Sequence, residues 1–181
     1  MGLNIGDEVV IKNKNNLIFR FVDYSNGKAI LFGKNFRLIK EEEVTNLLPA
    51  PYYRSSIPEL PNILRSKAKL KIGKVLHIDG DEYYLNKALQ IYKYYSVPAV
   101  GYHIKEINIA DVAMDLVTKH NPSIVVLTGH DGIKTGCENN LYDETSYRYS
   151  SFYAKAIKSI RSKRPNLDDL VIISGACQSY Y

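Results

Sequence analysis

A histidine and a cysteine each stand just beyond an apolar stretch of the chain, with His130 about 50 positions before Cys177. An isolated thiol has a pKa of about 8.5 and is mostly protonated at neutral pH. A neighbouring imidazole favours the thiolate and supplies a proton to a leaving amine. The two residue types therefore suggest nucleophilic catalysis at an acyl carbon, with Cys177 as the nucleophile and His130 as the acid and base.

Glycines stand near both residues. Gly129 and Gly132 flank the His130-Asp131 pair in the sequence. Because a glycine has no side chain, backbone N–H groups beside it can approach a reacting carbonyl closely. We expect the backbone N–H groups of Asp131 and Cys177 to stabilise the negative oxygen of a tetrahedral intermediate.

The elements that must position these residues begin at about residue 72, where strands alternate with helices. The alternation predicts a parallel sheet with right-handed crossovers and helices on both faces. In such sheets the residues that follow the strands meet at one edge, so His130 and Cys177 are expected there together. The strands are expected at 75–78, 97–104, 123–128 and 170–174, and the helices at 82–95, 110–119 and 146–164.

The first part of the chain has a different pattern. Short apolar and β-branched runs are separated by tight turn signals such as Asn26-Gly27. Residues 1–48 are therefore predicted to form a small SH3-like β-barrel. Residues 49–71 contain Pro51, Pro58 and Pro61 between polar stretches and are predicted to be a linker. The α/β domain would then occupy residues 72–181.

Composition excludes several classes of protein. The chain of 181 residues is 45% hydrophobic, has no apolar run near the ~20 residues that span a bilayer, and shows no signal-peptide pattern, so we expect a soluble intracellular protein without a membrane partner. The net charge of +5 and 15 tyrosines resemble those of RNA-binding proteins, but the basic residues are scattered, so nucleic acid is not the expected partner. No Cys/His spacing predicts zinc or another cofactor, and Cys137 is taken as incidental. The sequence gives no oligomeric state.

Three segments resemble the YabG family of sporulation-specific peptidases: GKVLHIDGD at 73–81, LTGHD at 127–131 and GACQS at 175–179. The resemblance runs through the whole chain. It implies a cysteine endopeptidase of an endospore-forming bacterium, made in the mother cell, that processes spore coat and cortex-associated proteins and cleaves after arginine. The matching catalytic residues are His130 and Cys177, and the expected locations are the mother-cell cytoplasm and the spore coat.

The same resemblance points to the wider caspase and clostripain clan. It implies a caspase-like fold, although Asp131 stands where that clan usually has glycine and Gly175 where it often has Asp or Gln. Related peptidases continue through further strands after the cysteine. Residues 72–181 are therefore expected to be the N-terminal part of a caspase-like domain, cut off after the nucleophile.

Asp79 and Asp81 follow the first strand of the α/β part and allow two interpretations. They could line a pocket for the arginine side chain of a substrate, since this loop neighbours the catalytic edge. One of them could instead cap the following helix and contact no ligand.

Two other functions remain open. Paired carboxylates after a first strand resemble the magnesium pocket of a receiver domain, but Thr128 stands where the phosphoacceptor aspartate would end the third strand. The chain could also be a scaffold, in which the barrel binds protein or RNA and the α/β part has no activity.

Overall fold

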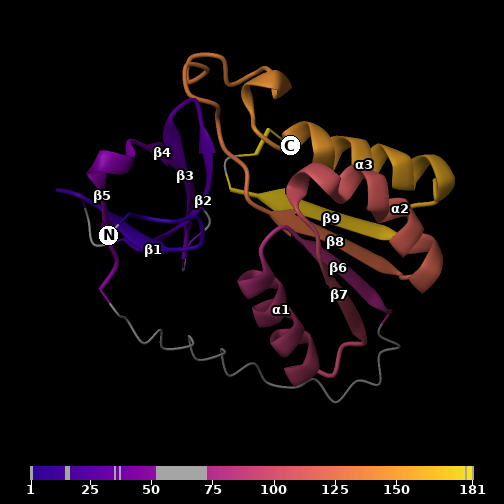
Figure 1. Cartoon of the computed structure of the whole chain (residues 1–181). Helices are drawn as coiled ribbons and strands as arrows, with labels where there is room; N and C mark the ends of the chain where they lie inside the picture. The colour runs from indigo at the N-terminus through magenta and orange to yellow at the C-terminus, as the bar shows by residue number, and fades with distance from the viewer. Residues whose placement is uncertain are drawn as a thin grey trace.

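The computed structural model describes residues 2–14, 17–34, 36, 38–51, 73–177 and 179–180. From position 52 onward the expected linker lies outside these residues. Gln178, which follows the expected nucleophile, also lies outside them. The described residues form two sheets of different kinds (Figure 1).

The N-terminal sheet is antiparallel, with the order β4-β3-β2-β1-β5. Its central hairpin turns at Asn26-Gly27, where both φ angles are positive, as the tightest hairpin turns require. Phe21 and Leu31 are fully buried in its core. The short strands expected here are confirmed, and a fifth strand pairs with the first at the start of the expected linker. The strands are β1 (Glu8–Ile11), β2 (Phe19–Ser25), β3 (Lys28–Gly33), β4 (Ile39–Glu42) and β5 (Leu47–Pro49), with a 3-10 turn, η1 (Val44–Asn46), before the last.

The second sheet is parallel, as expected, with the order β7-β6-β8-β9. One helix covers one face and two helices cover the other (Figure 1). The strands are β6 (Val75–Asp79), β7 (Ala99–His103), β8 (Ile124–Gly129) and β9 (Val171–Ala176). The helices are α1 (Glu82–Tyr94) on the first face and α2 (Ile109–His120) and α3 (Ser150–Lys163) on the second, with 3-10 turns η2 (Glu106–Asn108) and η3 (Glu144–Ser146) before the latter two.

Strand register sets the carboxyl ends of three strands at one level. Asp79 pairs with Thr128, and Thr128 pairs with Gly175 on the other side. His130 follows β8 directly and Cys177 follows β9 directly. The expected common edge for the two residues is therefore confirmed.

The long helix begins four residues later than its periodicity predicts. Residues 146–149 do not join α3, because the backbone N–H of Tyr149 donates to the Asp131 carboxylate instead. A Ser150 hydroxyl donates to the same carboxylate. A contact with a distant strand end thus overrides the local helical pattern.

The core of the parallel sheet lies under α2 and α3. Leu76, Ile78 and Leu127 of the strands pack with fully buried residues of both helices. All five residues of β6 are buried, which is typical of a strand covered on both faces.

Replacing Leu127 with alanine tests this core. The side chain is fully buried, so Leu127→Ala is expected to lower the free energy of unfolding by about 2–5 kcal/mol. Leu141→Ala removes the same atoms at a site with 46% exposure and is expected to change it by less than about 0.5 kcal/mol. Urea unfolding followed by circular dichroism measures both, and similar losses in the two variants would contradict the packing described.

Candidate active site

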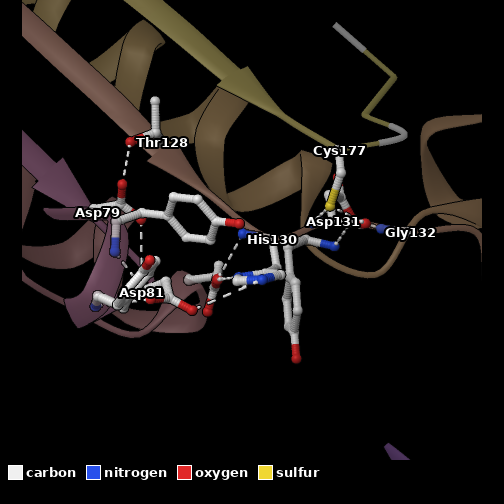
Figure 2. Close-up of polar contacts among 12 residues, drawn as sticks. Asp79, Asp81, Thr128, His130, Asp131, Gly132 and Cys177 are labelled. Atoms are coloured by element: carbon white, nitrogen blue, oxygen red, sulfur yellow. Dashed lines mark hydrogen bonds and ion pairs between the residues drawn. The ribbon is translucent and has the colours of Figure 1, made fainter. Parts of the chain in front are cut away.

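The sulfur of Cys177 lies against the backbone of Asp131. The N–H of Asp131 donates to the sulfur at 3.5 Å, and the thiol donates to the Asp131 carbonyl at 3.2 Å (Figure 2). The thiol thus sits beside the residue that follows His130, and the N–H expected to bind an oxyanion faces it.

The His130 side chain is fully buried and held from several sides. The ring of Phe32, from the N-terminal sheet, stacks on it with centroids 4.1 Å apart and 20° between the planes. Tyr84 approaches edge-on at 6.4 Å. Nδ1 lies 3.9 Å from a Glu106 carboxylate oxygen, and Nε2 lies 3.8 Å from Asp81 Oδ2. The imidazole therefore lies between two carboxylates.

Asp131 contributes to the site through both its backbone and its side chain. The buried carboxylate accepts hydrogen bonds from the N–H groups of Gly132 and Tyr149, each at 2.8 Å, and from the Ser150 hydroxyl. Burial raises the pKa of this carboxyl, and the hydrogen bonds oppose that rise. These contacts fix the loop so that the N–H of Asp131 is directed at Cys177.

The two acidic residues after β6 have different surroundings. Asp79 is fully buried and accepts hydrogen bonds from the Thr128 hydroxyl at 2.6 Å and from the Asp81 N–H at 2.9 Å. Asp81 caps α1, because its Oδ1 accepts from the N–H groups of Tyr83 and Tyr84. The helix cap expected of one of the two residues is thus formed by Asp81. The other carboxylate oxygen of Asp81, Oδ2, faces His130 (Figure 2). Asp79 contacts the backbone N–H of Asp81.

A third carboxyl at this edge was missed by the sequence analysis. Glu106, just after β7, is 5% exposed, and its Oε1 accepts a hydrogen bond from the backbone N–H of His130 at 2.9 Å. Burial raises the pKa of this carboxyl to about 7. The sequence carries a signal for this residue, because Glu106 closely follows the strand expected at 97–104 and so belongs to the same edge of the sheet.

Two glycines at the strand ends leave room for Glu106. A Cβ on Gly80 would lie 2.1 Å from Glu106 Oε1, and one on Gly129 would lie 3.0 Å from it. A Cβ on Gly129 would also meet the Tyr153 hydroxyl at 2.1 Å. Both Gly80 and Gly129 therefore leave room for the buried Glu106 carboxyl.

A cavity of about 430 Å³ lies between the two sheets, next to this cluster. Asp81 and Glu106 line it from the α/β part, and Phe32 lines it from the N-terminal sheet. An ion pair between Glu41 and Arg148 and a hydrogen bond from Thr135 to Glu41 also join the two parts. Residues from both parts thus surround the candidate site. The other charged residues that line the cavity are two acidic ones, Asp23 and Glu82, and three basic ones, Arg20, Lys34 and Lys105.

Cys137 is a free cysteine in the loop between β8 and α3, where its backbone forms turns with Lys134 and Asn140. Within the described residues, His, Cys, Asp and Glu form no group of three that could hold a metal ion. In that same part of the chain, no helix has the length and apolar character to cross a membrane.

Comparisons with known proteins agree on one family. Residues 61–181 match the family model described as YabG peptidase U57. A relative from Bacillus subtilis (strain 168), the "Sporulation-specific protease YabG", is 42% identical over 109 residues, which are 60% of this chain and 37% of the relative. The chain thus spans little more than a third of that relative's length. No solved structure matches the chain.

Glu106 makes stability depend on pH. Its pKa rises from 4.5 to about 7 on folding, so between these values the folded chain binds a proton that the unfolded chain has lost. Stability from this carboxyl is therefore present at low pH and is lost as pH rises, by about 3 kcal/mol in all. Chemical unfolding from about pH 5 to about pH 8 should show this fall in the unchanged chain and not in Glu106→Gln. Asp111→Asn, which alters an exposed carboxyl in α2, should show the same fall in stability as the unchanged chain. An equal dependence of stability on pH in all three proteins would contradict the raised pKa of Glu106.

Phe32 shields the His130 ring from solvent. Phe32→Ala removes the ring that stacks on it and is expected to speed modification of His130 by diethyl pyrocarbonate several-fold, as measured by peptide mapping. Phe36→Ala is the matched control, because Phe36 packs edge-on against Phe19 within the N-terminal sheet. Equal rates of modification in the two variants would show that Phe32 is not the cover.

Proposed function

Because the chain belongs to the YabG peptidase family U57, we propose that it is a cysteine endopeptidase of sporulation, with Cys177 as nucleophile and His130 as acid and base. One observation carries the choice of residues. The Cys177 sulfur contacts the backbone of Asp131, next to His130, at the shared edge of β8 and β9. The chain belongs to a family of peptidases, and its thiol lies next to the strand end that carries His130. Both observations support nucleophilic catalysis by the cysteine.

The reaction would proceed through an acyl-enzyme. The thiol proton passes to His130, and the sulfur bonds to the substrate's carbonyl carbon. The N–H groups of Asp131 and Cys177 donate to the resulting oxyanion, and the imidazolium returns the proton to the leaving amine as the C–N bond breaks. Water then attacks the thioester, releases the acid product and restores the thiol.

The reaction requires two movements. Nε2 of His130 lies 3.8 Å from Asp81 and Nδ1 lies 3.9 Å from Glu106, so the ring must first turn one nitrogen toward the thiol to take its proton. The second movement gives the substrate access to the ring. A leaving amine must come within about 3 Å of an imidazole nitrogen, yet His130 is fully buried. Phe32 covers one face of the ring and also lines the cavity. A shift of Phe32 would open His130 toward that cavity, which is where a substrate would lie.

Preference for arginine would come from the acidic groups of the same cavity. We assign the substrate-binding role to Asp81, whose carboxylate lines the cavity, with Asp79 holding the Asp81 backbone from behind. The substrates we propose are spore coat and cortex-associated proteins, met in the mother cell and in the coat. No observation supports the receiver function or the scaffold function. The Asp79 carboxylate, which a receiver would use to bind magnesium, accepts a hydrogen bond from Thr128.

An arginyl chloromethyl ketone tests the dyad. The electrophile is expected to alkylate Cys177, and the adduct should vanish in Cys177→Ala and fall by at least about 100-fold in His130→Ala, in line with loss of an acid and base. Mass spectrometry of tryptic peptides locates the adduct. Labelling at Cys137, or labelling of Cys177 that is independent of His130, would overturn the assignment.

A second reagent separates specificity from reactivity. Asp81→Asn is expected to slow labelling by the arginyl reagent about tenfold and to leave labelling by a norleucyl reagent nearly unchanged. The two reagents share the reactive group and differ in the charge of the side chain. An equal loss with both would show that Asp81 acts on His130 or on the α1 cap and not on the substrate.

A further inference from the structure

Glu106 occupies a place where a carboxyl is costly. Charged side chains are rarely buried unless they are paired, yet Glu106 is 5% exposed. Gly80 and Gly129, at the ends of two neighbouring strands, are the residues whose missing side chains make space for it. Three strand ends therefore converge on one carboxyl, which indicates a role beyond packing.

The carboxyl contacts His130 in two ways. Its Oε1 accepts the backbone N–H of His130 at 2.9 Å, and the same oxygen lies 3.9 Å from Nδ1 of the ring. The first contact fixes the backbone at the end of β8. The second contact places a negative charge beside Nδ1, whereas Nε2 faces Asp81. A negative charge beside Nδ1 would favour the protonated ring.

The other groups around Glu106 bear on its charge. Asp79 and Asp81 act on it as like charges from the end of β6. Burial, and after it the charge of Glu106, raises the pKa of the Tyr149 phenol. Lys105 precedes it in the chain, and the Tyr153 hydroxyl of α3 reaches the same space beside Gly129. His130 is the partner whose charge would change during the reaction.

We propose that Glu106 is a positioning residue for His130, which holds the histidine backbone and stabilises the imidazolium formed when Cys177 loses its proton. This inference rests on the proposed dyad. The thiol proton moves to His130, so a negative sulfur and a positive ring form together. A charged Glu106 lowers the energy of that pair, whereas a protonated Glu106 does not.

The test is the rate at which iodoacetamide alkylates Cys177, since only the thiolate reacts. Glu106→Gln keeps an oxygen that can accept the His130 N–H but removes the charge. Because Glu106 titrates at about pH 7, the amide variant should react about tenfold more slowly than the unchanged chain near pH 8 and at nearly the same rate near pH 5.5. A purely structural role would lower the rate by the same factor at both values.

Two controls are built into the chain. Cys137 is alkylated in the same sample and serves as the reference thiol, with each peptide quantified by mass spectrometry. Asp111→Asn removes an exposed carboxyl from the first turn of α2 and should not alter the rate at either pH. Thermal unfolding confirms that each variant is folded, and Glu106→Gln is expected to be the more stable near pH 8 because it removes a buried charge.

The outcomes separate the two proposals. If Cys177 of the unchanged chain reacts no faster than Cys137 at any pH, the dyad itself fails. If Cys177 is the faster thiol but Glu106→Gln has no effect, or an equal effect near pH 5.5 and pH 8, the positioning role of Glu106 fails and the dyad stands. Should the amide variant not fold, Glu106→Asp, which withdraws the carboxyl by one methylene, is read by the same criterion.

Discussion

The site depends on register within a parallel sheet. Asp79, Thr128 and Gly175 pair across three neighbouring strands, so the chain leaves β6, β8 and β9 at one level. Parallel strands all deliver their following residues to the same edge, which is why His130 and Cys177, from distant parts of the sequence, both follow strands that end at this edge. A shift of one residue in any strand would turn its side chains to the other face and disperse the site.

Burial of charge at that edge is the second constraint. Asp131 and Glu106 are both nearly or fully buried, and each is bound by backbone N–H groups that offset part of its desolvation. These contacts fix the backbone on either side of His130. The N-terminal sheet adds Phe32 on the ring and Glu41 on Arg148, so residues of both sheets contact the candidate site.

Most of the fold was predictable from local pattern. The parallel order, the strands and the helices followed from periodicity and turn signals, with bounds that differ by a few residues. The start of α3 is the largest difference among the α/β helices, because the Asp131 carboxylate binds the N–H of Tyr149 from outside the helix. The extra strand β5 was missed since three residues at the border of a proline-containing segment carry no periodicity of their own.

The sequence by itself determined which residue types stand at the strand ends, and hence that Cys177 and His130 meet at one edge. Only the tertiary structure decided that the His130 ring faces Asp81 and Glu106, that Phe32 covers it, and that Asp79 is buried behind Asp81. The reason is physical. Periodicity reports whether a residue lies on an inward or outward face, whereas the partner of a buried charge is chosen by contacts between segments far apart in the chain, and these form only when the sheets and helices pack.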